Sequence, residues 1–511
     1  MIYGLVQTWV LISSRFYAYL NDFWILRALA DRFELMQPAA LQDGFFPYLY
    51  PFIQVFVPDS AALHFSGFLS LASSLGVLWF VWAIAVRMAG PWWSLIAVWV
   101  VAFNPMFFIY ATVPGADLVA VLPMVAALWL LARQATQDQG AKLWVLFTAG
   151  LLIAIGATLR YHILLFAVVP LVYAVLCSRP RFRGLLVTLA GLAAGYLPQA
   201  IVNVSAGVSP LATLQSFNVL RQTVGVDWND TSELNPATYG SVLRIAQTYP
   251  HEFLSGYLAS LAYFTVILVF VAIAVFVLQG SRWSSYLWSL AAGGFVYAGA
   301  TSLAFSERAL IPLVPIWAIS ASILAIGISR VTRQLTSQAV GSSRSARAAL
   351  TLLTCTVVAW ATLPWVQAAE KNAVARVNLE SGREQQDTAF SQLDYADNMN
   401  EVFTNDFFFY STQTPGFVAR YNDGLIRISQ RGRPMAGEVD TSGIQEFLCS
   451  ALNNGIRAVV WNPGYTSGTN AELALILSGQ AAHPSVMSTL SGGLVFSQLN
   501  FRTDPCRVNS S

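Results

Sequence analysis

Residues 65–86 read FSGFLSLASSLGVLWFVWAIAV, a run with no charged side chain between His64 and Arg87. A bilayer core about 30 Å thick requires roughly 20 apolar residues per helical span, so this run predicts a transmembrane helix. The composition of the whole chain supports the same class. Of its 511 residues, 56% are hydrophobic and only 11% are charged, whereas about a quarter of the residues in a soluble domain are charged.

Similar apolar runs recur along the chain and predict about 11 transmembrane helices. They lie near residues 1–20, 65–86, 92–110, 115–133, 143–158, 161–177, 184–204, 257–279, 284–304, 309–328 and 349–366. The first run lacks a basic residue before it and contains Ser13, Ser14 and Arg15. A secretory signal peptide is its alternative, although no small-residue cleavage site follows it. The fold class is therefore a polytopic α-helical membrane protein.

Basic residues gather in every second loop, which predicts the orientation because cytoplasmic loops are enriched in arginine and lysine. They are Arg87, Arg133, Lys142, Arg179, Arg181, Arg183, Arg282, Arg330, Arg333, Arg344 and Arg347. The opposite loops contain eleven of the 12 acidic residues of residues 1–365. With eleven spans, this pattern predicts a cytoplasmic N-terminus and an extracytoplasmic C-terminal segment.

The domain boundary is predicted near residue 366. Residues 1–366 form the membrane domain, with long outer loops at 21–64 and 205–256, and residues 367–511 form a soluble extracytoplasmic α/β domain. Short β-like runs at 401–404, 425–428, 456–461 and 494–496 and helical candidates at 443–453 and 469–479 support the α/β prediction. Cys449 and Cys506 lie in this domain and can form a disulfide in an oxidising compartment, with two unpaired thiols as the alternative.

Both outer loops contain predicted interfacial helices. In residues 21–34 the charged residues Arg27, Asp31 and Glu34 recur at helical spacing opposite apolar residues, which is typical of a helix lying flat at the membrane interface. Residues 239–249, before Pro250, predict a second such helix.

Several function classes lack their sequence motifs. The chain contains no G-x-x-x-x-G-K-[ST], G-x-G-x-x-G, H-E-x-x-H or C-x-x-C motif, which argues against ATP-driven transport, dinucleotide chemistry and zinc hydrolysis by those routes. A net charge of +2 without a basic stripe argues against nucleic-acid binding. What remains is a set of charged residues at the predicted outer ends of helices, namely Asp22, Asp43, Asp117, Arg160 and Arg308.

The order of these residues resembles the GT-C glycosyltransferases, especially the bacterial relatives of protein O-mannosyltransferases and of the aminoarabinose transferase that modifies lipid A. The matching segments are Asp22 after the first span, the aromatic-proline segment 44–51, the Pro114–Asp117 turn, Leu159–Tyr161 and Ser306–Pro315. The resemblance covers roughly residues 1–365. It implies a bacterial inner-membrane enzyme of cell-envelope assembly that transfers a sugar from a polyprenyl phosphate to a lipid, glycan or protein acceptor at the outer face.

Within that resemblance Asp22 is the candidate catalytic base. Phosphate is a weakly basic leaving group, whereas the acceptor hydroxyl must lose its proton as it attacks, and a nearby carboxylate can accept that proton. The expected reaction is a single displacement that inverts the sugar configuration. The alternative roles of Asp22 are a helix cap or an interface anchor.

The other candidates are substrate-binding residues. Arg308 and Arg160 suit a phosphate because the planar guanidinium can contact two oxygens; for Arg308 an internal pair with Glu307 or an interface anchor is the alternative. Asp43 and Asp117 are candidates to orient a sugar hydroxyl or to share a Mg²⁺ or Mn²⁺ ion, although Asp117 also suits helix capping. Tyr48 and Tyr50 are candidates for stacking on the sugar or the polyprenyl chain.

The alternative function is a polytopic transporter or flippase for a lipid or a small solute. Transporters tend to have inverted repeats and polar groups near the middle of the bilayer. In this sequence the ionisable residues cluster at the predicted outer face and no repeat is visible, which favours the enzyme. A third hypothesis is a noncatalytic assembly or receptor protein, in which the acidic residues are dispensable.

Overall fold

The structure is a computed structural model. It describes residues 2–13, 23, 26, 27, 29, 30, 47–136, 140–205, 209–211, 219, 220, 223, 242–255, 270, 271, 273–275, 277, 283–301, 307–339, 367, 401–404, 417–422, 425–430, 439–461, 470–491, 494–501 and 504–506.

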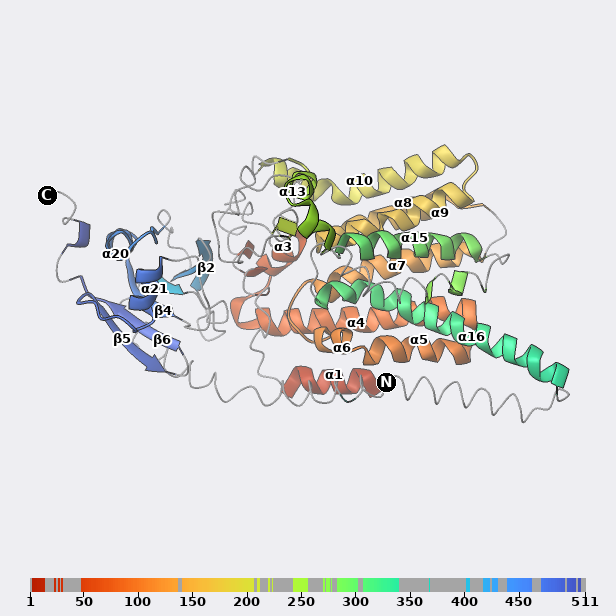
Figure 1. The fold of residues 1–511 in the computed structure, drawn as a ribbon, viewed down its shortest axis with the longest axis horizontal. Helices are drawn as coiled ribbons and strands as arrows, with labels where there is room; N and C mark the ends of the chain where they lie inside the picture. Colours follow the sequence, from red (N-terminus) through yellow and green to blue (C-terminus); the bar gives the residue numbers. More distant parts are fainter. Residues whose placement is uncertain are drawn as a thin grey trace.

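The membrane body is a bundle of apolar helices running side by side (Figure 1). Its helices are α1 (Ile2–Ser13), α3 (Leu49–Val55), α4 (Asp59–Ala89), α5 (Pro91–Phe103), α6 (Pro105–Tyr110), α7 (Asp117–Ala135), α8 (Leu143–Ala157), η2 (Tyr161–Ala167), α9 (Val168–Cys177), α10 (Arg181–Ser205), α13 (Val242–Thr248), α15 (Ser284–Thr301), η5 (Glu307–Leu313) and α16 (Val314–Ala339). Within the described residues, 4 helical segments are long and apolar enough to cross a membrane, at 61–89, 117–135, 181–205 and 308–329.

Most predicted spans coincide with these helices. The predicted third span, 92–110, is interrupted at Asn104, because Pro105 has no N–H and its ring clashes with the preceding helical turn. The Asn104 side chain accepts a hydrogen bond from the Phe107 N–H at 3.1 Å and so caps the short α6. The predicted run 349–366 and most of 257–279 lie outside the described residues, so the total of eleven spans stays a prediction.

The helices α8 and α10 approach each other closely through glycine. A Cβ atom on Gly191 would overlap the carbonyl oxygen of Phe147, and one on Gly150 would overlap the carbonyl oxygen of Thr188. Small residues allow such approach of helix backbones in a membrane, where packing rather than water exclusion holds helices together. The backbones of α8 and α10 are therefore in direct contact at these glycines.

The short helix α3 is attached to two other parts of the bundle. The Leu49 N–H donates to the Thr158 carbonyl at 3.1 Å, and the Tyr48 N–H donates to Gln199 Oε1 at 2.9 Å. Both α3 and α13 come from the predicted outer loops, and they lie at the same end of the bundle (Figure 1). The predicted helix at 239–249 is confirmed as α13.

The predicted interfacial helix at 21–34 differs from expectation at Arg27. Its described residues are helical and buried, Phe23, Leu26 and Ala30 among them, but Arg27 is buried as well, with 1% of its surface exposed. The Arg27 guanidinium donates to the Gln54 carbonyl at 2.6 Å, and the Gln54 side chain donates to Ser66 Oγ at 2.9 Å. Arg27 therefore anchors this segment to α3 instead of facing solvent.

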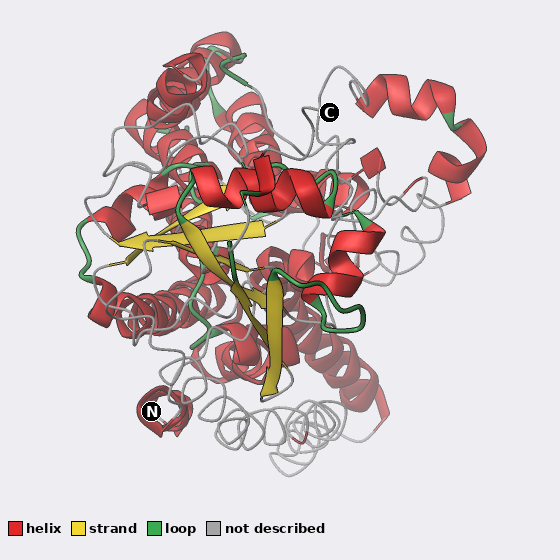
Figure 2. Ribbon diagram, turned by 90° about the vertical axis from the view of Figure 1, so that its left-hand side faces the viewer, coloured by secondary structure: helices red, strands yellow, loops and turns green. Residues whose placement is uncertain are grey.

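The C-terminal residues form a mixed six-stranded sheet with helices, which confirms the predicted α/β structure (Figure 2). The strands are β1 (Glu401–Thr404), β2 (Phe417–Asn422), β3 (Leu425–Gln430), β4 (Ile456–Trp461), β5 (Val486–Ser491) and β6 (Leu494–Leu499). Their order is β2-β3-β1-β4-β6-β5, and β1 and β4 are the parallel pair. The helices α20 (Ile444–Asn453) and α21 (Ala471–Leu477) bury Phe447 and Leu477 in the core with Phe403 and Val459.

Cys449 on α20 and Cys506 form a disulfide with a Cα–Cα distance of 4.9 Å. The bond joins residues 57 positions apart and ties the end of the described chain to α20. The disulfide alternative is therefore confirmed over two unpaired thiols.

Removal of this bond by Cys449→Ser with Cys506→Ser is expected to lower the free energy of unfolding of the C-terminal domain by about 2–4 kcal/mol, because cross-linking restricts the unfolded chain. Limited proteolysis of the purified protein should show faster cleavage within residues 439–506. Cys177→Ser, which changes the described cysteine outside the disulfide, is the control and should leave this cleavage unchanged. Equal cleavage of all three proteins would contradict the prediction.

Candidate functional site

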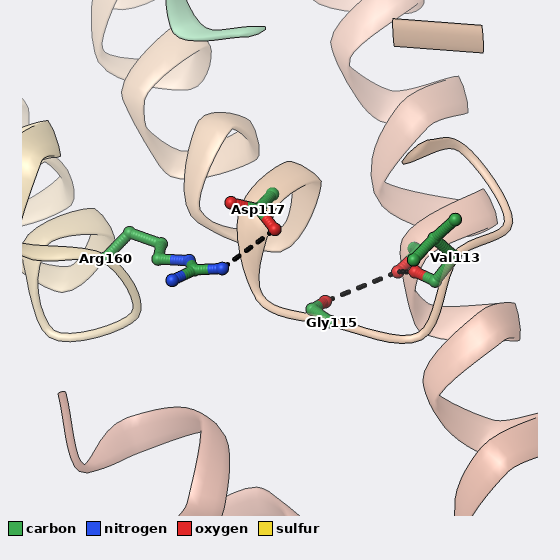
Figure 3. A network of polar contacts seen from close by, with 5 residues as sticks. Val113, Gly115, Asp117 and Arg160 are labelled. Atoms are coloured by element: carbon green, nitrogen blue, oxygen red, sulfur yellow. Dashed lines mark hydrogen bonds and ion pairs between the residues drawn. The ribbon is translucent and has the colours of Figure 1, made fainter. Parts of the chain in front are cut away.

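The centre of the site is an ion pair between Asp117 and Arg160 (Figure 3). Arg160 Nη2 lies 2.9 Å from Asp117 Oδ2, and the two side chains are about 10% and 9% exposed. A buried pair of this kind is costly to break, because removal of one partner leaves the other charge without compensation. The two residues are 43 positions apart, so the fold brings them together.

Local structure places each partner at the end of a helix. The turn before Asp117 is held by Ser70, whose hydroxyl donates to the Val113 carbonyl at 2.8 Å and lies 3.4 Å from the Gly115 carbonyl. Asp117 then begins α7, with Ala116 as the N-cap residue, so Asp117 is in the first turn and is not the cap. Arg160 has an extended backbone between the end of α8 and η2, which directs its side chain across to α7.

Tyr50 lies near this pair. Its ring is fully buried, and its hydroxyl lies near Ser66, the Gly115 backbone, Asp117 and Arg160. Burial raises the pKa of the Tyr50 phenol above its ordinary value, so it is a neutral hydroxyl at neutral pH. Tyr48 is only half-buried, with its ring 6.3 Å from that of Phe52. Of the two tyrosines, only Tyr48 therefore offers ring surface for stacking.

Arg308 on η5 is half-buried and lies close to the same site. His162, on the first turn of η2, is within electrostatic range of Arg160, Asp117 and Arg308. The described part of the site thus contains two guanidinium groups and one carboxylate. Arginine pairs of this kind suit an anionic ligand with several oxygen atoms, such as a phosphate.

Tyr297 on α15 connects these groups and was not predicted from the sequence. Its ring is fully buried, stacks on Phe166 at 4.6 Å and meets the edge of His162 at 5.9 Å. Its hydroxyl donates to the Ala309 carbonyl at 2.8 Å, directly beside Arg308. Tyr297 therefore holds the turn that carries Arg308, and the sequence offers no signal for this because Tyr297 is one aromatic within an apolar run.

The structure thus brings together four of the predicted site residues, Tyr50, Asp117, Arg160 and Arg308. Tyr48 lies at the start of α3, beside them in sequence and joined to α10. Asp22 and Asp43 lie outside the described residues. Within the described part of the chain no group of three His, Cys, Asp or Glu side chains is placed to hold a metal ion. Asp117 directs one of its carboxylate oxygens to Arg160. The divalent-ion hypothesis therefore depends on Asp22 and Asp43.

Comparisons with known proteins agree with this arrangement. Residues 61–201, which carry Asp117 and Arg160, match the family described as dolichyl-phosphate-mannose-protein mannosyltransferase. The apo oligosaccharyltransferase of Archaeoglobus fulgidus shares the fold with a TM-score of 0.53 at 12% identity, over 94% of this chain and 69% of that one. The same archaeal enzyme tethered to an acceptor peptide containing the NVT sequon aligns with a TM-score of 0.50 at 12% identity, over 90% and 68% of the two chains. No curated protein sequence matches the chain.

These findings confirm the resemblance to the GT-C glycosyltransferases. The family match lies on the helices that form the Asp117–Arg160 site, and the shared fold extends over nearly the whole chain. The chain thus has the fold of the archaeal oligosaccharyltransferase, and residues 61–201 resemble a family of membrane glycosyltransferases.

Proposed function

We propose that the protein transfers a sugar from a polyprenyl-phosphate donor to an acceptor at the outer face of the bacterial cytoplasmic membrane, with inversion at the sugar carbon. The observation that carries the proposal is the buried Asp117–Arg160 pair with Arg308 nearby, at the end of the bundle where α3 lies. The acceptor is a cell-envelope lipid, glycan or protein. The family that matches residues 61–201 is named for a dolichyl-phosphate donor, which has the same chemistry.

Two arginines at a water-poor site suit the departing polyprenyl phosphate. Phosphate needs neutralisation of its charge more than it needs a proton, and arginine supplies a fixed charge with paired donors. Arg160 is held in position by Asp117, and Arg308 by the turn that Tyr297 supports. In this proposal both arginines contact the phosphate, and Tyr48 supplies a surface for the sugar or the polyprenyl chain.

Asp22 is the proposed general base. Arg27, on the same segment, is anchored to α3 beside Tyr50, and this supports a position of Asp22 close to the Asp117–Arg160 site. Asp43, in the same loop, is the proposed residue for orienting a sugar hydroxyl. If a Mg²⁺ or Mn²⁺ ion takes part, its carboxylate ligands come from these two residues.

The proposed topology places residues 1–366 in the membrane and residues 367–511 outside the cell membrane. The disulfide between Cys449 and Cys506 supports this orientation, because structural disulfides persist in oxidising compartments. The tail domain is then on the same side as the site.

The test uses the purified full-length protein in lipid nanodiscs, supplied with a panel of polyprenyl-phosphate sugars and an envelope lipid extract. The measured product is free polyprenyl phosphate. Release with one donor, dependent on the extract, is the expected result. No release with any donor, together with movement of a labelled lipid between leaflets, would overturn the proposal in favour of a flippase.

Tyr297→Phe is expected to raise the KM for the donor roughly fivefold with a smaller change in kcat. The substitution keeps the buried ring but removes the hydrogen bond to Ala309, worth about 1 kcal/mol, and so loosens the turn that carries Arg308. Tyr286→Phe, at a fully buried tyrosine near the other end of α15, is the matched control. Equal effects of the two substitutions on KM would contradict a positioning role for Tyr297.

A further inference from the structure

Two arginines share one tryptophan at the end of the bundle opposite the site. The guanidinium carbon of Arg87 and that of Arg133 each lie 5.8 Å from the centre of the Trp129 ring. Arg87 is in the last turn of α4, and Arg133 is in the last turn of α7. Both belong to the loops that the arginine distribution predicts to be cytoplasmic.

Both arginine side chains are exposed, yet they are held close to the helices. Arg87 Nη1 donates to the Ala83 carbonyl at 2.8 Å, which keeps its guanidinium against α4. Among the residues that the structure describes, Asp117 and Arg160 form the ion pair, and neither Arg87 nor Arg133 has a carboxylate partner. An anion that contacts these guanidinium groups would supply the countercharge that the described residues do not give them.

An aromatic surface continues from Trp129 toward the middle of the membrane. The rings of Trp79 and Phe80 lie 5.9 Å and 5.5 Å from that of Trp129, and Trp79 is 52% exposed. Arg87 is seven residues beyond Phe80, which corresponds to about 10 Å along the helix axis. The aromatic surface thus lies deeper in the membrane, at the level of lipid acyl chains, and the two arginines lie at the level of the lipid headgroups. This order matches that of the acyl chains and the headgroup of a lipid.

We propose that Arg87, Trp129 and Arg133 bind the phosphodiester headgroup of an anionic phospholipid of the cytoplasmic leaflet, with its acyl chains along Trp79 and Phe80. Two arginines can each direct a planar pair of donors to the phosphate oxygens, whereas a single interface arginine makes one such contact. The ligand is the lipid and not free phosphate, because the exposed aromatic surface lies beside the cations. This site is separate from the Asp117–Arg160 site and does not depend on the proposed reaction.

The experiment measures binding of phosphatidylglycerol and of phosphatidylcholine to the full-length protein in an uncharged detergent, by native mass spectrometry. Wild type is expected to bind phosphatidylglycerol more tightly at its strongest site. The double variant Arg87→Gln/Arg133→Gln is expected to weaken that binding by about tenfold. The matched control Arg181→Gln/Arg183→Gln removes the same charge from exposed residues at the start of α10, on the same predicted side, and should change it by less than about twofold.

Equal weakening in the control pair would overturn the proposal, because binding would then follow overall charge. Displacement of the lipid by inorganic phosphate at equal concentration would also overturn it, since the free anion would be the ligand. Helical circular dichroism and size-exclusion elution report folding. Should the double variant not fold, Arg87→Gln and Arg133→Gln are measured singly, and an unchanged preference for phosphatidylglycerol in both would count against the site.

Discussion

Asp22→Asn is expected to lower the rate of sugar transfer by about 10²- to 10⁴-fold, the usual contribution of a positioned general base. The amide keeps the size of the side chain but cannot accept the proton of the acceptor hydroxyl. Donor binding should change little, because the proposed phosphate contacts come from Arg160 and Arg308. The measurement is release of free polyprenyl phosphate in nanodiscs, with donor affinity determined separately.

Asp31→Asn is the matched control, because it makes the same change nine residues further along the same loop. This control should retain transfer close to that of wild type. Equal release by wild type and Asp22→Asn would still support a transferase, but Asp43 or Asp117 would then be the candidate base. A parallel loss in donor affinity would instead indicate a structural role for Asp22.

Arg160→Gln is expected to destabilise the protein by about 3–5 kcal/mol, because it leaves the buried carboxylate of Asp117 without its partner. Asp117→Asn should be costly for the same reason, since it leaves the buried guanidinium uncompensated. The double variant Arg160→Gln/Asp117→Asn should lose clearly less free energy of unfolding than the sum of the losses of the two single variants. Equilibrium unfolding in mixed detergent micelles measures all three, with exposed Arg181→Gln as the control.

The double-mutant cycle formed by these variants separates the structural role of Arg160 from its proposed role in phosphate binding. The coupling energy between two residues in direct contact is typically 0.5–3 kcal/mol. Additive losses would contradict the ion pair as a stabilising contact. In the transfer assay, a double variant that folds but does not release polyprenyl phosphate would support a phosphate-binding role for Arg160 beyond its structural one.

The membrane helices were largely predictable because each one follows an apolar run bounded by charge, proline or glycine. The predicted run 284–304 corresponds to α15 (Ser284–Thr301), and 184–204 corresponds to α10 (Arg181–Ser205). The sheet was predicted less completely. Strands β2 and β5 were missed, since FVARYN and VMSTLS mix polar and apolar residues without a clear alternation. Each pairs antiparallel with the strand that follows it, through Asn422–Leu425 and Ser491–Leu494. The intervening sequences, Asp423-Gly424 and Gly492-Gly493, are typical of two-residue hairpin turns, so the local signal for both strands lay in the turn and not in the strand.

The candidate site was predictable by residue type but not by contact. The sequence indicated that charges gather at one predicted face, yet nothing in it pairs Asp117 with Arg160, since side chains on different helices meet only through the packing of the bundle. Burial of Arg27 was missed for a related reason. Its spacing places it with the charged residues of an amphipathic helix, whereas the carbonyl of Gln54 supplies a buried acceptor from another segment.

The glycine contact between α8 and α10 bears on how the protein adapts to bilayers of different thickness. The two helices have 15 and 25 residues, which gives lengths of about 22 Å and 37 Å at 1.5 Å per residue. One is shorter and the other longer than the hydrocarbon core of a bilayer, which is about 30 Å thick. A single helix accommodates hydrophobic mismatch by tilting. Backbones in direct contact at Gly150 and Gly191 cannot tilt independently, so the two helices must tilt together as a pair when the bilayer thickness changes.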